Sequence, residues 1–283
     1  MQTLTLQHPD GPLVVDLHQP PTAQPSPPVL LVHGWGGSGR YWSGLIERLG
    51  GRYRFITPDL PGVGRSLPVR RAYTMADHVA ALEWLLDRLE LPRIQLIGHS
   101  MGGGLGILLA ARRPELIERM VLTSICLFRN ERERQSFVLI ARMLGLSMRL
   151  RAPWMASVAL LRRAAARRYF YRVPQDDAML REGFLDYLLM DRKTAVASAR
   201  SAASPEIPAA ARRIQCSTLL VAPREDQVMP IANVEYTGRI IPGCTVRWIE
   251  RCGHLPMVER PDEYAAVVDA FLRPSTLALG APG

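Results

Sequence analysis

The sequence has no long hydrophobic run and only one lysine. No uncharged apolar stretch approaches the roughly 18 residues needed to cross a bilayer. Residues Met1–His8 carry neither the basic segment nor the apolar core of a signal peptide. We therefore expect a cytoplasmic protein. Lys193 is the single lysine, so arginines supply nearly all of the 35 basic residues, which exceed the 26 acidic residues and give a net charge of +9.

Cysteines are also few, and none of the four forms a CxxC pair or a metal-ligand cluster (Cys126, Cys216, Cys244 and Cys252). We interpret them as reduced, mostly buried thiols. Cys252 stands two residues before His254, which predicts a place near a functional site without a nucleophilic role. No metal or other cofactor is expected, because no segment resembles a metal or nucleotide site. Nucleic acid is not an expected partner, because the arginines are not interleaved with aromatic stacking residues.

Short apolar runs alternate with helical patterns over most of the 283 residues, a length that can bury a large core. Apolar positions repeat with helical spacing in some segments and form short continuous runs in others. We expect strands at 4–7, 13–17, 29–32, 54–57, 94–97, 120–123, 218–222 and 245–249, and helices at 38–49, 74–89, 103–112, 230–240 and 261–272. Alternation of this kind predicts the α/β class, with a mostly parallel sheet covered by helices on both faces.

The alternation stops between residues 124 and 208, where the pattern is helical throughout. An all-helical block inside an α/β alternation indicates an inserted cap. We therefore expect a core formed by residues 1–123 and 209–273, a helical cap at 124–208 and a flexible tail at 274–283.

A G-x-S-x-G motif, Gly98–Gly102, follows the predicted strand 94–97 and precedes the predicted helix 103–112. This is the context that a nucleophile elbow requires. The turn is too sharp for side chains on its flanks, so glycines stand on both sides of Ser100. The serine then projects outward, beside the free N–H groups at the start of the following helix. We predict that Ser100 is a nucleophile.

A second glycine-rich turn, His33–Gly37, follows the strand 29–32. Its glycines would let backbone N–H groups face a substrate oxygen. We predict that the N–H groups of Trp35 and Met101 form an oxyanion hole. The alternative is an ordinary strand-to-helix turn without a catalytic role.

A serine nucleophile needs a base and an acid that orients the base. His254 follows the strand 245–249 and Asp226 follows the strand 218–222, so both lie at the carboxyl edge of the sheet with Ser100. The order serine, acid, histidine suits this kind of fold. Glu225 is the competing candidate for the acid. The remaining histidines are interpreted as structural (His33 and His99) or as surface residues (His8, His18 and His78).

Together these segments resemble the α/β-hydrolase superfamily. The resemblance rests on His33–Gly37, residues 59–66 (DLPGVGRS), Gly98–Gly103, Asp226 and Gly253–His254, and covers roughly residues 1–123 and 210–273. It implies a catalytic triad of Ser100, Asp226 and His254. It also implies Trp35 and Met101 as oxyanion donors, and a cap after the strand 120–123. Trp35, Met101 and Leu255 are the candidates for the wall of the substrate pocket.

Departures from related patterns narrow the predicted activity. The nucleophile position holds Ser100 and not aspartate, which argues against haloalkane dehalogenases and epoxide hydrolases. His99 stands where C–C bond hydrolases usually have asparagine. The motif is similar to those of carboxylesterases, monoacylglycerol lipases, lactonases and perhydrolases. We expect hydrolysis of esters with small to medium apolar acyl groups. The alternatives are a thioesterase, a lactonase, a C–C bond hydrolase or a ligand receptor with slow turnover.

The predicted cap carries most of the net charge. Residues 129–208 contain fifteen basic and eight acidic residues, so +7 of the +9 lies there. Apolar residues recur between the charges at helical spacing. One interpretation is a set of amphipathic helices with a solvated arginine face. The other is an apolar pocket roof whose basic outer face meets an acidic carrier protein, a coenzyme phosphate or an anionic membrane. The oligomeric state is left open.

Overall fold

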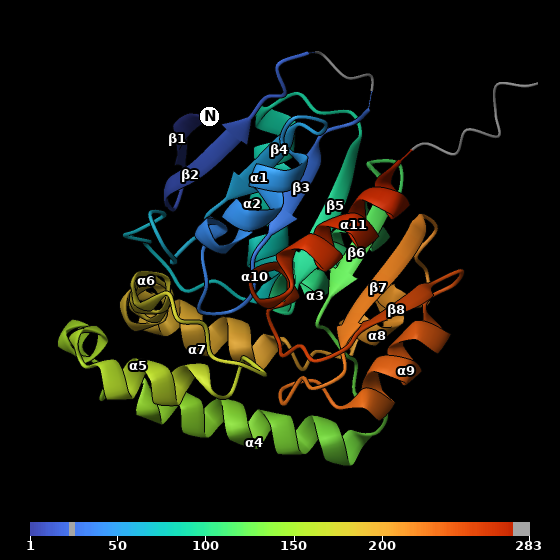
Figure 1. The fold of residues 1–283 in the computed structure, drawn as a ribbon. Helices are drawn as coiled ribbons and strands as arrows, with labels where there is room; N and C mark the ends of the chain where they lie inside the picture. Colours follow the sequence, from blue (N-terminus) through green and yellow to red (C-terminus); the bar gives the residue numbers. More distant parts are fainter. Residues whose placement is uncertain (23–25, 274–283) are drawn as a thin grey trace, which may run out of the picture.

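An eight-stranded sheet forms the centre of the computed structural model, which describes residues 1–22 and 26–273 (Figure 1). The strands are β1 (Gln2–His8), β2 (Gly11–His18), β3 (Val29–Val32), β4 (Phe55–Pro58), β5 (Ile94–His99), β6 (Ile117–Thr123), β7 (Ser217–Pro223) and β8 (Thr245–Ile249). Their order is β1-β2-β4-β3-β5-β6-β7-β8. Neighbours are parallel from β4 across to β8, and β2 is antiparallel to β1 and β4. The predicted mostly parallel sheet is confirmed, while the predicted tail 274–283 lies outside the described residues.

Two hydrophobic layers cover the sheet, as its all-apolar central strands require. In β3, Leu30 and Val32 belong to one buried cluster, whereas Val29 and Leu31 belong to the other. The first layer comes from α2 (Met75–Arg88), α3 (Met101–Arg112), α8 (Glu206–Ala211) and α9 (Ile231–Ile240). The second comes from α1 (Ser43–Leu49), α10 (Pro256–Glu259) and α11 (Pro261–Leu272). The sheet is thus held from both sides.

The helical pattern expected at 38–49 begins as a 3₁₀ helix, η1 (Gly39–Trp42), in which the Ser43 N–H bonds to the Arg40 carbonyl three residues back, and continues as α1. One detail of the prediction was wrong. His78, expected at the surface, lies fully buried on the inner side of α2. Burial lowers its pKa to about 3, so its ring is neutral in the folded protein.

Every element between β6 and β7 is a helix. The elements are α4 (Glu131–Ser147), η2 (Pro153–Ser157), α5 (Ala159–Ala166), α6 (Asp177–Leu189), α7 (Arg192–Ser201) and α8. Since Ile207 and Ala211 of α8 share a buried cluster with α3, this helix packs with the core, and the boundary expected at 208 falls inside it. We call residues 124–205 the helical insertion. Within the described ranges, no helix is long and apolar enough to cross a membrane.

The helical insertion is attached to the core by specific hydrogen bonds as well as by packing. The bonds are Asp191 N–H to the Gly62 carbonyl (2.8 Å), Trp35 Nε1–H to the Ala195 carbonyl (3.0 Å), Met75 N–H to Ser201 Oγ (2.8 Å) and Ser38 Oγ–H to Asp186 Oδ2 (2.5 Å). They involve the loops after β3 and β4 and the start of α2. The insertion therefore lies over the carboxyl edge of the sheet (Figure 1).

Gly102 supplies a test of the packing of α3 against the end of β3. A Cβ at this position would lie 2.2 Å from the Val32 carbonyl oxygen and 2.7 Å from the His33 carbonyl oxygen. Because both contacts are with backbone, we expect Gly102→Ala to destabilise the protein by more than about 4 kcal/mol or to abolish folding. Urea unfolding followed by circular dichroism measures this.

The matched control is Gly183→Ala in α6, where an added Cβ meets no atom within 4 Å. Removing a glycine from a helix interior should stabilise it by up to about 1 kcal/mol. Equal stability of the two variants would contradict the close packing of α3 against β3.

Candidate active site

Ser100 occupies a strained turn between β5 and α3. Its φ of 52° and ψ of −116° are rarely adopted by a residue with a side chain. The neighbouring backbone over-determines this conformation: the Ser100 N–H donates to the Thr123 carbonyl at 2.8 Å, and the Ser100 carbonyl accepts the Gly103 N–H at 2.9 Å. The serine side chain therefore stands at the start of α3, among N–H groups that favour negative charge.

The glycines on either side of Ser100 are required by space. A Cβ on Gly98 would lie 2.4 Å from the Gly102 carbonyl oxygen, and one on Gly102 would lie 2.2 Å from the Val32 carbonyl oxygen. Likewise, a Cβ on Gly34 would lie 3.2 Å from the Ser100 Cβ. The turn after β3 thus packs directly on the serine.

Asp226 and His254 form a buried pair. His254 Nδ1 donates to Asp226 Oδ2 at 2.8 Å, and the two side chains are only 5% and 1% exposed, respectively. The other carboxylate oxygen, Asp226 Oδ1, accepts the N–H groups of Val228 at 2.7 Å and Met229 at 3.1 Å. This turn fixes the carboxylate, and the carboxylate fixes the tautomer of the histidine. Nε2 is left as the nitrogen that can accept a proton.

Glu225, the competing candidate for the acid, has a different partner. Its Oε2 accepts the Cys252 N–H at 2.9 Å, and its own N–H donates to the Cys252 carbonyl at 3.2 Å. Glu225 therefore joins the loop after β7 to the loop after β8, and Asp226 is the residue that contacts the His254 ring. Cys252 is buried, and burial raises the pKa of its thiol, so it is an inert group beside the site.

The two N–H groups predicted for an oxyanion hole have no hydrogen-bond partner among the residues that the structure describes. These are the amides of Trp35 and Met101. The turn that carries Trp35 is stiffened by His33, whose Nδ1 contacts the Gly34 carbonyl at 2.8 Å and whose Nε2 accepts the Leu60 N–H at 2.9 Å. The interpretation of His33 as a structural residue agrees with these contacts.

A chain of hydrogen bonds runs from the Trp35 turn to the histidine loop. The Gly34 N–H donates to the Tyr41 hydroxyl oxygen, Tyr41 contacts His99 Nδ1 at 3.0 Å, and His99 Nε2 contacts the His254 carbonyl at 2.9 Å. Burial lowers the pKa of His99 and raises that of Tyr41, so both are neutral. Because a carbonyl only accepts, Nε2 of His99 carries the hydrogen and Nδ1 accepts from the Tyr41 hydroxyl. Sequence patterns gave no indication of Tyr41.

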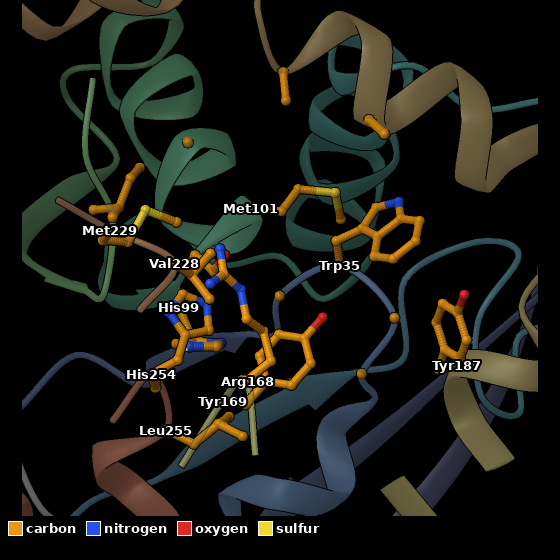
Figure 2. Close-up of a pocket in the computed structure, with 18 of the residues that line it drawn as sticks. Trp35, His99, Met101, Arg168, Tyr169, Tyr187, Val228, Met229, His254 and Leu255 are labelled. Atoms are coloured by element: carbon orange, nitrogen blue, oxygen red, sulfur yellow. The ribbon is translucent and has the colours of Figure 1, made fainter. Parts of the chain in front are cut away.

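Ser100 and His254 open into a cavity of about 1960 Å³ beneath the helical insertion. Figure 2 shows Trp35 and Met101 on one side of it and His254 and Leu255 on another. The three residues expected in the pocket wall therefore do line the cavity. Residues that the sequence did not indicate also line it (Tyr169, Tyr187, Val228 and Met229). They come from loops and from α6, where no local pattern marks an inward side chain.

Comparison with known proteins identifies the family. Residues 29–267 match the model of the alpha/beta hydrolase family, so the chain belongs to this family.

Individual relatives agree with this assignment. The chain is similar to "Putative carbamate hydrolase RutD" of Pseudomonas syringae pv. syringae, with 30% identity over 87% of this chain and 94% of that protein. It is 37% identical to an uncharacterized protein of Mycobacterium tuberculosis over 98 residues, which are 35% of this chain and 29% of that protein. An esterase from Thermogutta terrifontis has the same fold, with a TM-score of 0.78 and 24% identity over 96% of this chain and 98% of that one.

The series of hydrogen bonds through Tyr41 predicts a measurable difference in stability. Tyr41→Phe would leave the buried Gly34 N–H and His99 Nδ1 without partners, and an unsatisfied buried group costs about 1–3 kcal/mol. We expect a lower urea midpoint with an unchanged slope. Tyr236→Phe is the control, because its hydroxyl makes only a 3.4 Å contact with an exposed arginine. Equal urea midpoints for the two variants would show that the hydrogen bonds through Tyr41 contribute nothing to stability.

Proposed function

We propose that this hydrolase cleaves carboxylic esters of small to medium apolar acyl groups through an acyl-enzyme intermediate. The observation that carries the proposal is the buried Asp226–His254 pair, whose histidine lines the same mostly apolar cavity as Ser100. In the proposed roles, Ser100 is the nucleophile, His254 the general base and Asp226 the orienting acid.

In the first half of the reaction, Ser100 Oγ attacks the ester carbonyl while His254 Nε2 removes the serine proton. Asp226 keeps Nδ1 protonated and stabilises the imidazolium that forms. His254 then donates its proton to the leaving alkoxide, and the acyl group stays on Ser100. In the second half, water attacks the acyl-enzyme with His254 again acting as base.

The oxyanion of each tetrahedral intermediate would be bound by the N–H groups of Trp35 and Met101. Both amides are unpaired in the described part of the chain, so no existing bond has to break for them to donate. The Trp35 side chain is held by the Ala195 carbonyl at 3.0 Å and by the Tyr187 ring, whose centroid is 5.8 Å away. Donors held in place in this way lower the free-energy barrier to the tetrahedral intermediate, because they need not reorient when the oxyanion forms.

The wall of the cavity supports the choice of an apolar acyl group. Trp35, Met101, Met229 and Leu255 are apolar side chains in the wall of the cavity, which Tyr169 and Arg168 also line. Burial of acyl CH₂ groups against them favours binding by about 0.8 kcal/mol for each group.

Carbamate hydrolysis is the second candidate. It is favoured by the full-length similarity to "Putative carbamate hydrolase RutD". The same serine attack applies to a carbamate carbonyl, and parallel assays with esters and carbamates of matched alkyl groups would rank the two substrates by kcat/KM.

The first kinetic test uses p-nitrophenyl esters of increasing chain length. The wild-type enzyme should show turnover that varies with acyl length, and Ser100→Ala should lose about 10⁶-fold in kcat while it keeps its fold. Ser136→Ala, which removes a hydroxyl from the rim of the same cavity, is the matched control and should behave like wild type. Substantial turnover by Ser100→Ala would exclude the serine mechanism, and no turnover by the wild type would favour a receptor.

The second kinetic test compares the neighbouring carboxylates. Asp226→Asn keeps the shape but favours the wrong histidine tautomer, and in a comparable triad this costs about 10⁴-fold in kcat. Glu225→Gln should change kcat far less, since Glu225 contacts Cys252 and not His254. Steady-state kinetics with one ester measures both. The opposite order of losses would assign the acid to Glu225.

A further inference from the structure

The helical insertion exposes an unusual number of apolar side chains. Among the described residues, twelve large apolar side chains are exposed, and seven of these lie between residues 139 and 160 (Leu139, Ile140, Met143, Leu150, Trp154, Val158 and Leu160). Leu150 is 81% exposed, Leu160 75% and Trp154 66%. Scattered apolar side chains are normal on a protein surface, but a concentration in one segment marks a site of interaction.

The same segment is basic without any acidic residue. From Arg134 to Gln175 the chain has nine arginines and no aspartate or glutamate. Arg162 is tied to Asp177, and Arg151 bonds to backbone carbonyls of α6 and its end. By contrast, six arginines make no ion pair and no hydrogen bond through the guanidinium among the described residues (Arg142, Arg149, Arg163, Arg167, Arg168 and Arg172). Their charge is therefore free to act on a partner.

Apolar and basic side chains share the exposed sides of two helices. In α4, Arg142 and Met143 follow Leu139 by three and four residues, and all three are exposed. In α5, Leu160 is exposed and Arg163, three residues later, is half-buried, while the exposed Arg167 caps the end of the helix. Side chains at such spacings lie on one side of a helix.

These residues lie at the end of the molecule that is farthest from the sheet. Figure 1 shows α4 and α5 along that end, below α6 and α7. We call the set the apolar–basic face (Leu139, Arg142, Met143, Arg149, Leu150, Trp154, Leu160, Arg163 and Arg167).

We propose that the apolar–basic face docks on the surface of an anionic phospholipid bilayer. Arginine, leucine and tryptophan together suit the boundary of a bilayer, where phosphate charges and acyl chains are separated by only a few ångströms of depth. Each arginine gains attraction to anionic headgroups, and Trp154 suits the headgroup level. The charge and the apolar side chains are then satisfied by one partner.

Two other occupants suit the face less well. A second copy of this chain, related by a twofold axis, would bring two surfaces of unpaired positive charge together, and like charges repel. An acidic protein would neutralise the arginines, but carboxylates offer nothing to Leu150, Trp154 and Leu160. The bilayer matches both components.

Docking would also place the cavity next to the lipid. Ile140 and Leu150 are exposed on the insertion and also line the cavity. An apolar ester dissolved in the bilayer could then reach Ser100 without crossing water. This consequence rests on the proposed esterase function, whereas the docking itself does not.

The test is binding of the full chain to sedimented vesicles, with no activity measured. We expect binding to vesicles of phosphatidylcholine mixed with phosphatidylglycerol, with much weaker binding to phosphatidylcholine alone. Binding to the anionic vesicles should fall as salt is raised, because screening shortens the reach of the arginine charges. Tryptophan fluorescence should shift to the blue on binding, and Trp154→Phe should remove most of that shift.

Matched double variants separate the face from the net charge. Arg142→Gln with Arg163→Gln should weaken the vesicle partition coefficient by about 10-fold or more, since each arginine near the surface contributes a factor of about five. Arg88→Gln with Arg213→Gln removes the same charge from two exposed positions outside the insertion that have no ion-pair partner in the described part of the chain, and should have little effect. Leu150→Ser with Leu160→Ser should weaken binding by about 10-fold or more through lost apolar burial.

Three results would overturn the proposal. The first is no binding to anionic vesicles at low salt. The second is equal weakening by the two arginine pairs, which would indicate attraction by net charge alone. The third is evidence for another occupant without vesicle binding. This would be a wild-type dimer that Leu150→Ser with Leu160→Ser converts to monomer, or saturable binding to an acidic carrier protein. Because none of these assays needs turnover, failure of docking and failure of the esterase proposal are distinguishable.

Discussion

The contact between the Gly98–Gly102 turn and the end of β3 is the constraint on which the site depends. No side chain fits at Gly98 or Gly102, because backbone oxygens lie within 2.4 Å of the positions that a Cβ would occupy. This closeness lets β5 turn into α3 within one residue, and that residue is Ser100 with a positive φ. The strain at Ser100 is therefore the result of tight backbone packing, which the hydrogen bonds around the turn maintain.

The rest of the site is aligned to this turn by buried neutral groups. Tyr41 and His99 connect the Trp35 turn with the His254 carbonyl, and neither carries a charge that would have to be desolvated. The buried carboxylate of Asp226 is satisfied on both oxygens, by His254 and by the Val228 and Met229 amides. A histidine between these fixed groups has little freedom to adopt another orientation.

The sheet and the candidate residues at its edge were predictable because their signals are local. The apolar run 94–97, the glycines around Ser100 and the order of Asp226 and His254 are all visible in short stretches of sequence. Tyr41 meets His99 across 58 positions, a contact that no periodicity encodes. His78 was misplaced because its polar side chain suggested the surface, although it stands three residues after Met75 and four before Leu82 on the buried side of α2. Position on the helix outweighs polarity when a neutral ring can be buried.

The helical insertion is part of the site as well as its cover. The His254 N–H donates to the Tyr169 carbonyl at 2.6 Å, and a Cβ on Gly253 would meet that same carbonyl oxygen at 2.5 Å. The carboxylate of Glu259 then accepts N–H groups from Gly253 in the histidine loop and from Tyr171 in the insertion, at 2.8 and 3.1 Å. Without residues 169–171, these loop contacts would be lost and a buried N–H would have no partner. The segment that forms the roof of the cavity therefore also holds the loop that carries the base, so roof and base are positioned by the same few hydrogen bonds.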